Sequence, residues 1–439
     1  MIQENKTSRR NFLKTSALAS VTAATLGSGL NVHAAGSDEI KIGIVGCGGR
    51  GMGAVRDNLT AVPNSKLVAM GELFEDRAQA ARGALKEDMG DRVDVPDSNL
   101  FTGLDSYQGV VEKADVVLIA CASRFHPLYA KTAVEAGRHV FVEKPHGIDP
   151  AGVRQIYEAS KVAEKNQTAF VSGLCYRYDT LRRQAVEQVR SGLIGDIVAV
   201  QCDYIRTPYC MVKRQEGWSE VENQFRNWYH FTWLTGDEIL QSLLHNLDSA
   251  IWMLNEDIPK SAYGTGGRSA TYRPEFGDLF DHTSITYDYE DGRCIYGTTR
   301  AADNCFYSNK DVFHGAKGRC YFHAFDQPYI TDLDGKQIWI SDKKRERNPY
   351  VQEHYEMMQS IIDGKPINDG ERMSKTTMTA ILGFLACRCG QELNYQETWD
   401  SNFRFGPAEE DISLDMQPLV EPGEDGLYPV AVPGTTKDL

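Results

Sequence analysis

The sequence predicts an α/β protein of two domains: an N-terminal doubly wound parallel sheet, then an α+β domain with an open, mostly antiparallel sheet. Strand and helix patterns alternate from Ile40 to Pro145, as in a parallel sheet with crossover helices. From Ile197 onward the pattern changes to longer alternating strands, which is typical of antiparallel pairing. A chain of 439 residues also has room for two hydrophobic cores.

The first domain is predicted over residues 38–165. Short apolar runs bounded by turn residues are its expected strands: Ile42–Val45, Lys66–Gly71, Val116–Ala120 and His139–Val142. Helical patterns are found at Glu75–Leu85, Pro127–Ala136 and Pro150–Lys165, and a further strand is expected at Thr168–Gly173.

The second domain is predicted over residues 166–395. It begins with an amphipathic helix at Thr180–Ser191, and two helices close it, at Val351–Asp363 and Ser374–Cys389. The strands expected between them include Val198–Tyr204, Thr283–Tyr289, Cys294–Thr299 and Arg319–Phe322. An acidic tail containing Pro and Gly follows, over residues 396–439.

The turn after the first predicted strand is rich in glycine. Gly46 allows a tight turn, Gly48 lets the backbone approach a pyrophosphate, and Gly51 lets the next helix pack close to the strand. The N-terminus of that helix offers unpaired N–H groups to the anion. The second strand ends at Glu72, where a carboxylate is expected to bind a ribose 2′-hydroxyl and repel a 2′-phosphate. We therefore expect a Rossmann domain that binds NAD rather than NADP, although Glu72 at the start of a solvated loop would look similar.

The first 34 residues are predicted to be an export leader. The run Ser8-Arg9-Arg10-Asn11-Phe12-Leu13-Lys14 is a twin-arginine motif, followed by a mildly apolar segment and a small-residue site before Ala35. The segment is too short and too rich in small residues for a stable membrane span. A folded, periplasmic protein is expected, attached to the membrane only if the leader is not cleaved. Its NAD would be tightly bound and recycled on the protein or by a redox partner.

Composition narrows the possible partners. A formal net charge of −14 argues against nucleic acid or anionic lipid. The ten cysteines are scattered, and the Cys387–Cys389 spacing suits neither zinc nor a redox pair. We expect mostly buried thiols and no metal site.

Several segments, in the right order, resemble the Gfo/Idh/MocA oxidoreductases. They are the glycine loop, AVEAGRHVFVEKP at Ala133–Pro145, SGLIG at Ser191–Gly195 and HNLD at His245–Asp248. The resemblance implies that Lys144 lies beside the nicotinamide and the substrate hydroxyl, that Pro145 is cis, and that His126 lies near the nicotinamide. The strand end itself favours a ligand-contacting lysine, since a lysine there can exchange a proton with a carbinol oxygen. A surface lysine paired with Glu143 is the alternative.

Gln241 and His245 are four residues apart and are expected on one face of a helix within Gly236–Asp248. In the family the first position is usually aspartate and the histidine is the acid/base. Because glutamine cannot take up a proton, Lys144 and His245 would share the proton transfer, with Gln241 as a substrate ligand. A structural histidine on a buried helix is the alternative.

Further side chains are assigned to the substrate site or the cofactor site by their position in the sequence and their chemistry. Aromatic and polar side chains suit a sugar ring, although they could equally form core at the domain junction. The further substrate candidates are Arg177, Tyr178, Arg206, Arg226, Trp228 and His230. The further cofactor candidates are Cys47, Gly49, Arg50, Ser123, His126, Glu143 and Lys144.

Three functions fit these observations. The first is an NAD-dependent oxidoreductase that oxidises a hydroxyl of a sugar, polyol or glycoside, such as C3. The second is a glycosidase that oxidises C3 transiently, eliminates the glycosidic oxygen, adds water and reduces the sugar again. Relatives that work in this way depart from the EKP motif, which favours simple oxidation. The third is a binding protein with NAD as a prosthetic group. The resemblance also implies a homodimer or homotetramer.

Overall fold

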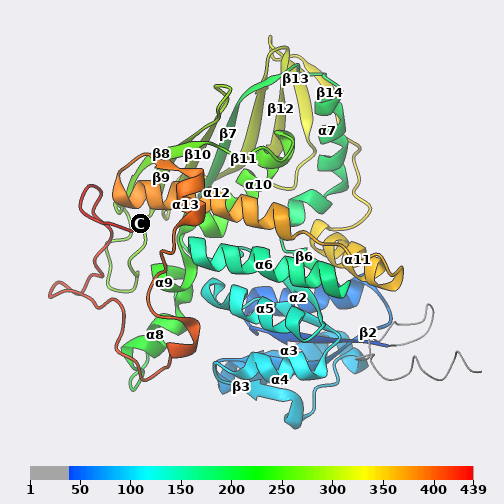
Figure 1. Ribbon diagram of the computed structural model, residues 1–439, viewed down its shortest axis with the longest axis vertical. Helices are drawn as coiled ribbons and strands as arrows, with labels where there is room; N and C mark the ends of the chain where they lie inside the picture. The colour runs from blue at the N-terminus through cyan, green and yellow to red at the C-terminus, as the bar shows by residue number, and fades with distance from the viewer. Residues whose placement is uncertain (1–38, 439) are drawn as a thin grey trace, which may run out of the picture. The chain divides into compact units, whose positions relative to one another are not determined.

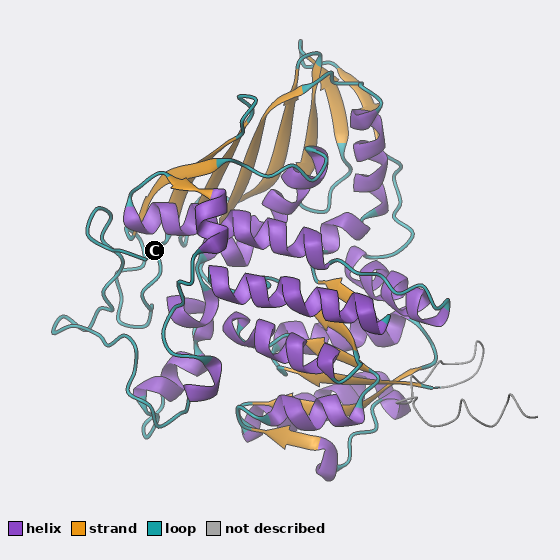
Figure 2. Cartoon of the chain, viewed as in Figure 1, coloured by secondary structure: helices purple, strands orange, loops and turns teal. Residues whose placement is uncertain are grey.

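The computed structural model describes residues 39–438 and confirms the predicted α/β fold with two sheets (Figures 1 and 2). The leader prediction, at residues 1–34, lies outside the described residues. In residues 39–438 no helix is both long enough and apolar enough to cross a membrane.

The first sheet is parallel and has the strand order β3-β2-β1-β4-β5-β6. Strand β4 is buried along its whole length and β5 from Val140 to Val142, which is why both read as apolar runs. The six strands are β1 (Ile40–Val45), β2 (Ser65–Glu72), β3 (Leu100–Thr102), β4 (Val116–Ile119), β5 (His139–Val142) and β6 (Phe170–Ser172). The order reverses between β1 and β4, so a ligand groove is expected at the carboxyl ends of these strands.

Helices cover both faces of the parallel sheet. They are α2 (Gly49–Ala61), α3 (Glu75–Met89), α4 (Ser106–Lys113), α5 (His126–Glu135) and α6 (Pro150–Asn166). Helix α11 (Pro349–Ile362) comes from the second half of the chain but packs on α2, and its Met357 and Met358 join the core beneath β1. Strand β6 and helix α11 thus both belong to the parallel-sheet layer.

The second sheet has nine strands in the order β14-β13-β12-β11-β7-β10-β9-β8-β15. Only its central pair, β7 with β10, is parallel. The strands are β7 (Ile197–Arg206), β8 (Ser261–Gly267), β9 (His282–Asp288), β10 (Cys294–Ala301), β11 (Ser308–Gly315), β12 (Gly318–His323), β13 (Tyr329–Asp332), β14 (Gln337–Ile340) and β15 (Leu393–Asn394).

The remaining helices pack against this sheet or connect it to the first. In Figure 1 α12 runs between the second sheet and α6, and it contacts both α6 and β8. The helices are α7 (Thr180–Arg190), α8 (Glu220–Arg226), α9 (Thr232–Thr235), the π-helical turn η6 (Ile239–Leu243), α10 (Leu244–Met253), α12 (Gly370–Cys389) and α13 (Tyr395–Asp400). Short 3-10 turns include η3 (Ser123–Phe125), η4 (Cys175–Tyr178) and η5 (Trp228–His230).

The acidic C-terminal segment, residues 401–438, packs along the body of the protein. Its Phe405, Ile412 and Tyr428 are buried. Arg124 donates hydrogen bonds to the backbone oxygens of Phe405 and Pro407. The segment therefore connects the parallel-sheet layer with the elements around α8.

Candidate active site

The glycine turn between β1 and α2 has the geometry that the sequence predicts. Gly46 has φ +94°, which is unfavourable for a residue with a side chain. A Cβ on Gly51 would lie 1.9 Å from the Gly46 carbonyl oxygen. A Cβ on Gly48 would meet no protein atom within 4 Å. The turn thus needs glycine at two positions for its own packing, and at Gly48 it leaves space for a ligand.

Glu72 closes this turn from the end of β2. Its Oε2 accepts a hydrogen bond from the Cys47 backbone N–H at 2.8 Å, and its Oε1 accepts from that of Leu73 at 2.8 Å. The carboxylate faces the groove while it orders the turn. Oε1 also accepts from the Phe74 backbone N–H at 3.3 Å, whereas Oε2 keeps a lone pair free, so the predicted contact with a ribose hydroxyl fits the structure through Oε2.

A groove of about 720 Å³ extends from the glycine turn across the ends of the parallel strands. The sequence-predicted residues Gly46, Gly48, Gly49, Arg50 and Glu72 line it. Cys47 and Gly51 lie behind the lining and shape the turn. The groove lining also includes Phe74, Arg77, Leu104 and Phe225, which are not predicted from the sequence. The groove and its phosphate-sized space at Gly48 fit a dinucleotide.

A second cavity, of about 1020 Å³, adjoins the groove. The two share Arg50, Ala120, Cys121, Trp228 and Tyr229 as lining residues. The second cavity also contains the predicted Lys144, Gln241, His245, Arg206, Glu143 and His126. The structure therefore brings the two catalytic candidates into one cavity at the end of the cofactor groove.

Lys144 lies two residues after the end of β5, and its peptide bond to Pro145 is cis, as expected. Its Nζ donates a hydrogen bond to the backbone oxygen of Gln241. Burial lowers the pKa of Lys144 to about 8, against the attraction of Glu143, and Arg206 lowers it further. A lysine of this pKa can exist in either protonation state near neutral pH.

Gln241 and His245 both line the cavity, but Gln241 lies within the π-helical turn η6 and His245 in the following helix α10. Such turns are rare and are frequent at functional sites. The Gln241 amide donates to Ser123 Oγ at 2.9 Å and to the Thr235 oxygen at 3.1 Å. Its amino group is therefore already bound to protein, and its backbone oxygen holds Lys144.

His245 is a neutral imidazole. Burial lowers its pKa well below the ordinary value, and the nearby Lys144 acts in the same direction. The ring packs on Tyr176 with a centroid distance of 5.0 Å, and its buried Nδ1 has no hydrogen-bond partner among residues 39–438. A buried, unpaired imidazole nitrogen beside a lysine favours a functional histidine over a structural one.

Glu143 and His126 hold the loops next to Lys144 in place. Glu143 pairs with Arg50, whose Nε lies 2.9 Å from Oε1. The ring of His126 bridges two loops, with Nδ1 2.8 Å from the Pro145 oxygen and Nε2 3.1 Å from the Cys121 oxygen. Burial lowers the pKa of His126 to about 4. These groups fix the loops after β4 and β5 around the point where the cavities meet.

One wall of the cavity is a stack of four planar groups. The Arg206 guanidinium lies 3.5 Å from the centre of the Tyr209 ring. Tyr209 stacks on Tyr229 at 4.2 Å, and Tyr229 stacks on Trp228 at 3.8 Å. We call this set the Arg206–Trp228 stack. It begins in the substrate cavity and ends in the groove.

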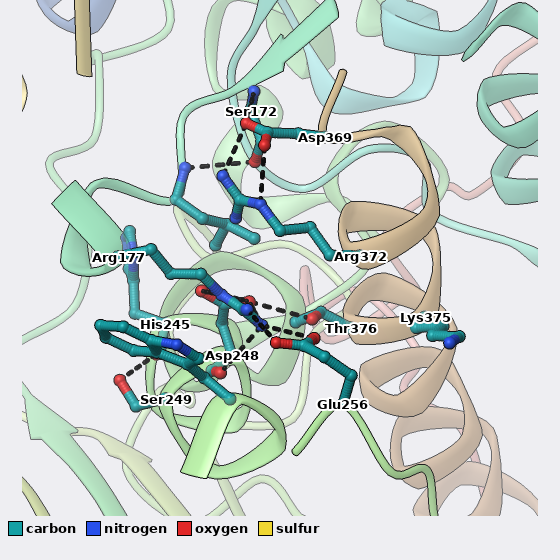
Figure 3. A network of polar contacts seen from close by, with 12 residues as sticks. Ser172, Arg177, His245, Asp248, Ser249, Glu256, Asp369, Arg372, Lys375 and Thr376 are labelled. Atoms are coloured by element: carbon teal, nitrogen blue, oxygen red, sulfur yellow. Dashed lines mark hydrogen bonds and ion pairs between the residues drawn. The ribbon is translucent and has the colours of Figure 1, made fainter. Parts of the chain in front are cut away.

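Four predicted substrate ligands lie elsewhere. Figure 3 shows Arg177 held between Asp248 and Glu256, where its Nε is 2.9 Å from both Asp248 oxygens. Tyr178 donates to Asp369 at 2.9 Å. Neither lines the cavity, because buried carboxylates from distant segments bind them.

Arg226 and His230 are also displaced from the cavity. Arg226 pairs with Asp76 and Glu222 and so joins α8 to α3. His230 lines a smaller neighbouring hollow beside Phe276. The cavity lining also includes Tyr204, Tyr209, Tyr307 and Tyr350, which are not predicted from the sequence. Tyr204 ends a predicted strand two residues before the Arg206 candidate, but Tyr307 and Tyr350 come from remote segments with no local signal.

Comparison with known proteins identifies the family. Residues 40–172 match the NAD-binding Rossmann-fold model of the Gfo/Idh/MocA oxidoreductase family, and residues 186–369 match the model of its C-terminal alpha/beta domain. The chain belongs to the Gfo/Idh/MocA oxidoreductase family. The predictions of this family, of its fold and of NAD as cofactor are thereby confirmed.

Relatives within the Gfo/Idh/MocA family have more than one activity. The chain is 27% identical over 168 residues to a glycosyl hydrolase family 109 protein of Phocaeicola vulgatus, covering 38% of this chain and 31% of that protein. It is 27% identical over 240 residues to an inositol 2-dehydrogenase of Acidothermus cellulolyticus, covering 54% and 60%. These matches span less than two thirds of each relative's length.

Solved Gfo/Idh/MocA structures share the fold. Scyllo-inositol dehydrogenase from Lactobacillus casei, solved with NAD(H) and scyllo-inositol, aligns with a TM-score of 0.61 at 20% identity, covering 82% of this chain and all of that one. Aldose-aldose oxidoreductase from Caulobacter crescentus, complexed with glycerol, aligns with a TM-score of 0.64 at 16% identity, covering 81% and 99%.

Proposed function

We propose that this Gfo/Idh/MocA oxidoreductase uses NAD to oxidise a hydroxyl of a sugar, polyol or glycoside. The observation that carries the proposal is Lys144, whose pKa is lowered to about 8 where the substrate cavity meets the dinucleotide groove. NAD, when bound, accepts a hydride from the carbinol carbon. The protein must then remove the hydroxyl proton, and neutral Lys144 is the base for this step.

His245 supports this proton transfer. Because it is neutral and lies in the same cavity, it can accept a hydrogen bond from, or donate one to, the reacting oxygen. The Gln241 backbone oxygen orients Lys144, and its side chain fixes Ser123. The glutamine therefore positions the site, while the lysine and histidine handle the proton.

A second candidate is favoured by the family 109 glycosyl hydrolase among the relatives. Oxidation at C3 acidifies the C2 hydrogen, the glycosidic bond then breaks by elimination, and water adds before the sugar is reduced again. The net reaction is hydrolysis. Retention of Glu143-Lys144-Pro145 favours the simple oxidation. An NAD-containing binding protein is the third candidate.

The test separates these candidates by product. The purified protein is denatured and the released dinucleotide is identified by mass spectrometry. The intact protein is incubated with NAD and a panel of inositols, aldoses and nitrophenyl glycosides. Absorbance at the NADH band with a keto product supports the oxidoreductase. Released nitrophenol and free sugar, with no net NADH, would support the glycosidase. Bound NAD with no product from any substrate would favour the binding protein.

We also propose that the protein is exported in folded form with NAD tightly bound, and that a redox partner reoxidises NADH. The support is the twin-arginine motif at Arg9-Arg10. Replacing both arginines by lysine should leave the protein in the cytoplasm, as judged by cell fractionation. Equal periplasmic amounts of the variant and the wild type would contradict export by this route.

A further inference from the structure

We propose that the substrate carries a carboxylate and that Arg206 binds it, so that the preferred substrates are uronic acids or uronides. This inference deepens the proposed function and rests on it for the reaction. It assigns Arg206 as the residue that determines substrate class.

Arg206 presents a guanidinium to the cavity from the end of β7. Its Nε donates to the Thr207 backbone oxygen at 2.9 Å, and its planar face lies on Tyr209. Across residues 39–438 no carboxylate oxygen lies within 4.0 Å of its nitrogens. The Tyr209 side chain contacts the guanidinium, and a planar guanidinium can offer the edge with its two terminal amino groups to a ligand.

The other cationic side chains of the cavity interact with different partners. Arg50 has Asp57 and Glu143 as partners. The Lys144 Nζ donates to the backbone oxygen of Gln241, and Arg206 repels its charge. The carboxylate of Glu238 also acts on Arg206, but it accepts from Ser242 and faces the hollow beside Phe276. The cavity thus collects two cations without a contacting carboxylate, in a chain of net charge −14.

A carboxylate matches this arrangement better than a neutral hydroxymethyl group. A guanidinium edge binds a carboxylate through two parallel hydrogen bonds, which are stronger than bonds between neutral groups. A phosphate carries more charge and usually adds backbone N–H groups at a helix N-terminus to its cations. One guanidinium on an aromatic stack is the simpler match for the planar carboxylate of a sugar acid.

The first experiment measures binding, so that it does not depend on turnover. NAD-loaded protein is titrated by calorimetry with methyl glucuronide, methyl galacturonide and methyl mannuronide, each paired with its neutral methyl glycoside. Glucose 6-phosphate is included as a second anion. We expect at least one uronide to bind about tenfold or more tightly than its neutral partner. No preference in any of the three pairs would overturn the proposal, and tightest binding by the phosphate would reassign the site to phosphate.

Variants of Arg206 separate recognition of the substrate's charge from a structural role of the side chain. Arg206→Gln should lower the uronide-to-glycoside affinity ratio towards one, and Arg206→Lys should restore part of it. Arg347→Gln is the matched control, since Arg347 also lies on a tyrosine ring, at 3.9 Å from the centre of Tyr355, but outside the cavity. An unchanged ratio in Arg206→Gln would refute the role of Arg206.

A pH profile gives an independent readout. Removing the Arg206 charge stabilises protonated Lys144, so the alkaline rise of kcat/KM should move to higher pH in Arg206→Gln but not in Arg206→Lys. If kcat/KM rises at the same pH in the wild type, Arg206→Gln and Arg206→Lys, Arg206 does not act on the pKa of Lys144. Uronide binding without any oxidation would leave this inference standing and refute the proposed reaction.

Discussion

Two opposing effects act on the pKa of Lys144, and desolvation is the larger. The neighbouring Glu143 carboxylate favours the charged amine, yet burial lowers the pKa to about 8. Each pKa unit is worth about 1.4 kcal/mol, so the environment disfavours the ammonium by a few kcal/mol. The result is a base that is available near neutral pH instead of only above pH 10.

The pH dependence of the reaction follows from this value. Oxidation needs neutral Lys144, so kcat/KM should rise with pH and level off above about pH 8. Reduction of the keto product needs the protonated amine and should decline over the same range. Lys144→Met should lower turnover by about a hundredfold or more while NAD remains bound, as judged by steady-state rates and dinucleotide titration. Retained activity would remove Lys144 from the mechanism.

Glu72 provides a second prediction, on the choice of dinucleotide. In Glu72→Gln an amide oxygen can still accept the Cys47 N–H, but the negative charge is lost. The ratio of NADP to NAD dissociation constants should therefore decrease by about tenfold, because a 2′-phosphate is no longer repelled. Fluorescence titration with both dinucleotides measures this ratio. If it stays the same, Glu72 has only the structural role of ordering the turn.

In the turn from β1 to α2, packing requires glycine at position 51, whereas Gly48 leaves space for a ligand. The two roles are thus separated within six residues. Gly51→Ala should lower both the thermal midpoint of the NAD-free protein and its NAD affinity, since the new Cβ meets the Gly46 oxygen at 1.9 Å. Gly48→Ala should leave the midpoint unchanged and weaken NAD binding, since its Cβ meets only the space of the groove. Calorimetry on the NAD-free protein and NAD titration give the two quantities.

Gly83→Ala is the control for these two variants. Gly83 lies in α3, and a Cβ there has no neighbour within 4 Å. NAD affinity should not change, and the helix should become slightly more stable. A weakened NAD affinity in Gly83→Ala, or a normal one in Gly48→Ala, would contradict the assignment of the turn.

The sequence predicts those elements whose local pattern is complete. The bounds predicted for β5 match the structure, because three consecutive buried apolar residues of a parallel-sheet strand, Val140–Val142, follow His139. The π-helical turn before His245 could not be predicted, since its apolar residues also fit an ordinary helix. Arg177 and Arg206 look alike in the sequence, but Asp248, 71 residues away, neutralises only Arg177. Partners that remote are set by tertiary structure.

For the whole molecule, the C-terminal segment completes the layer that carries the site. Arg124 is 2% exposed, and the acceptors for its guanidinium come from Phe405 and Pro407. It directly follows Ser123, which accepts the hydrogen bond from Gln241. The segment therefore supports the cavity from outside, although it lines neither cavity.

Substitution at Phe405 tests this support. Phe405→Ala removes a buried ring that packs on Phe384 and Phe403, and should lower the free energy of unfolding by about 3 kcal/mol. Val432→Ala, on the exposed surface of the same segment, should change it little. Urea denaturation followed by tryptophan fluorescence compares the two. Equal stability of both variants would show that the segment is dispensable.

The contact between Arg124 and the C-terminal segment also sets an order in time. The hydrogen bond from Arg124 to Phe405 joins residues 281 positions apart, so on the ribosome the turn beside Ser123 emerges long before its acceptors do. The site can therefore reach its final geometry only after synthesis has passed Pro407. Binding of NAD would then show that translation of the domain is complete.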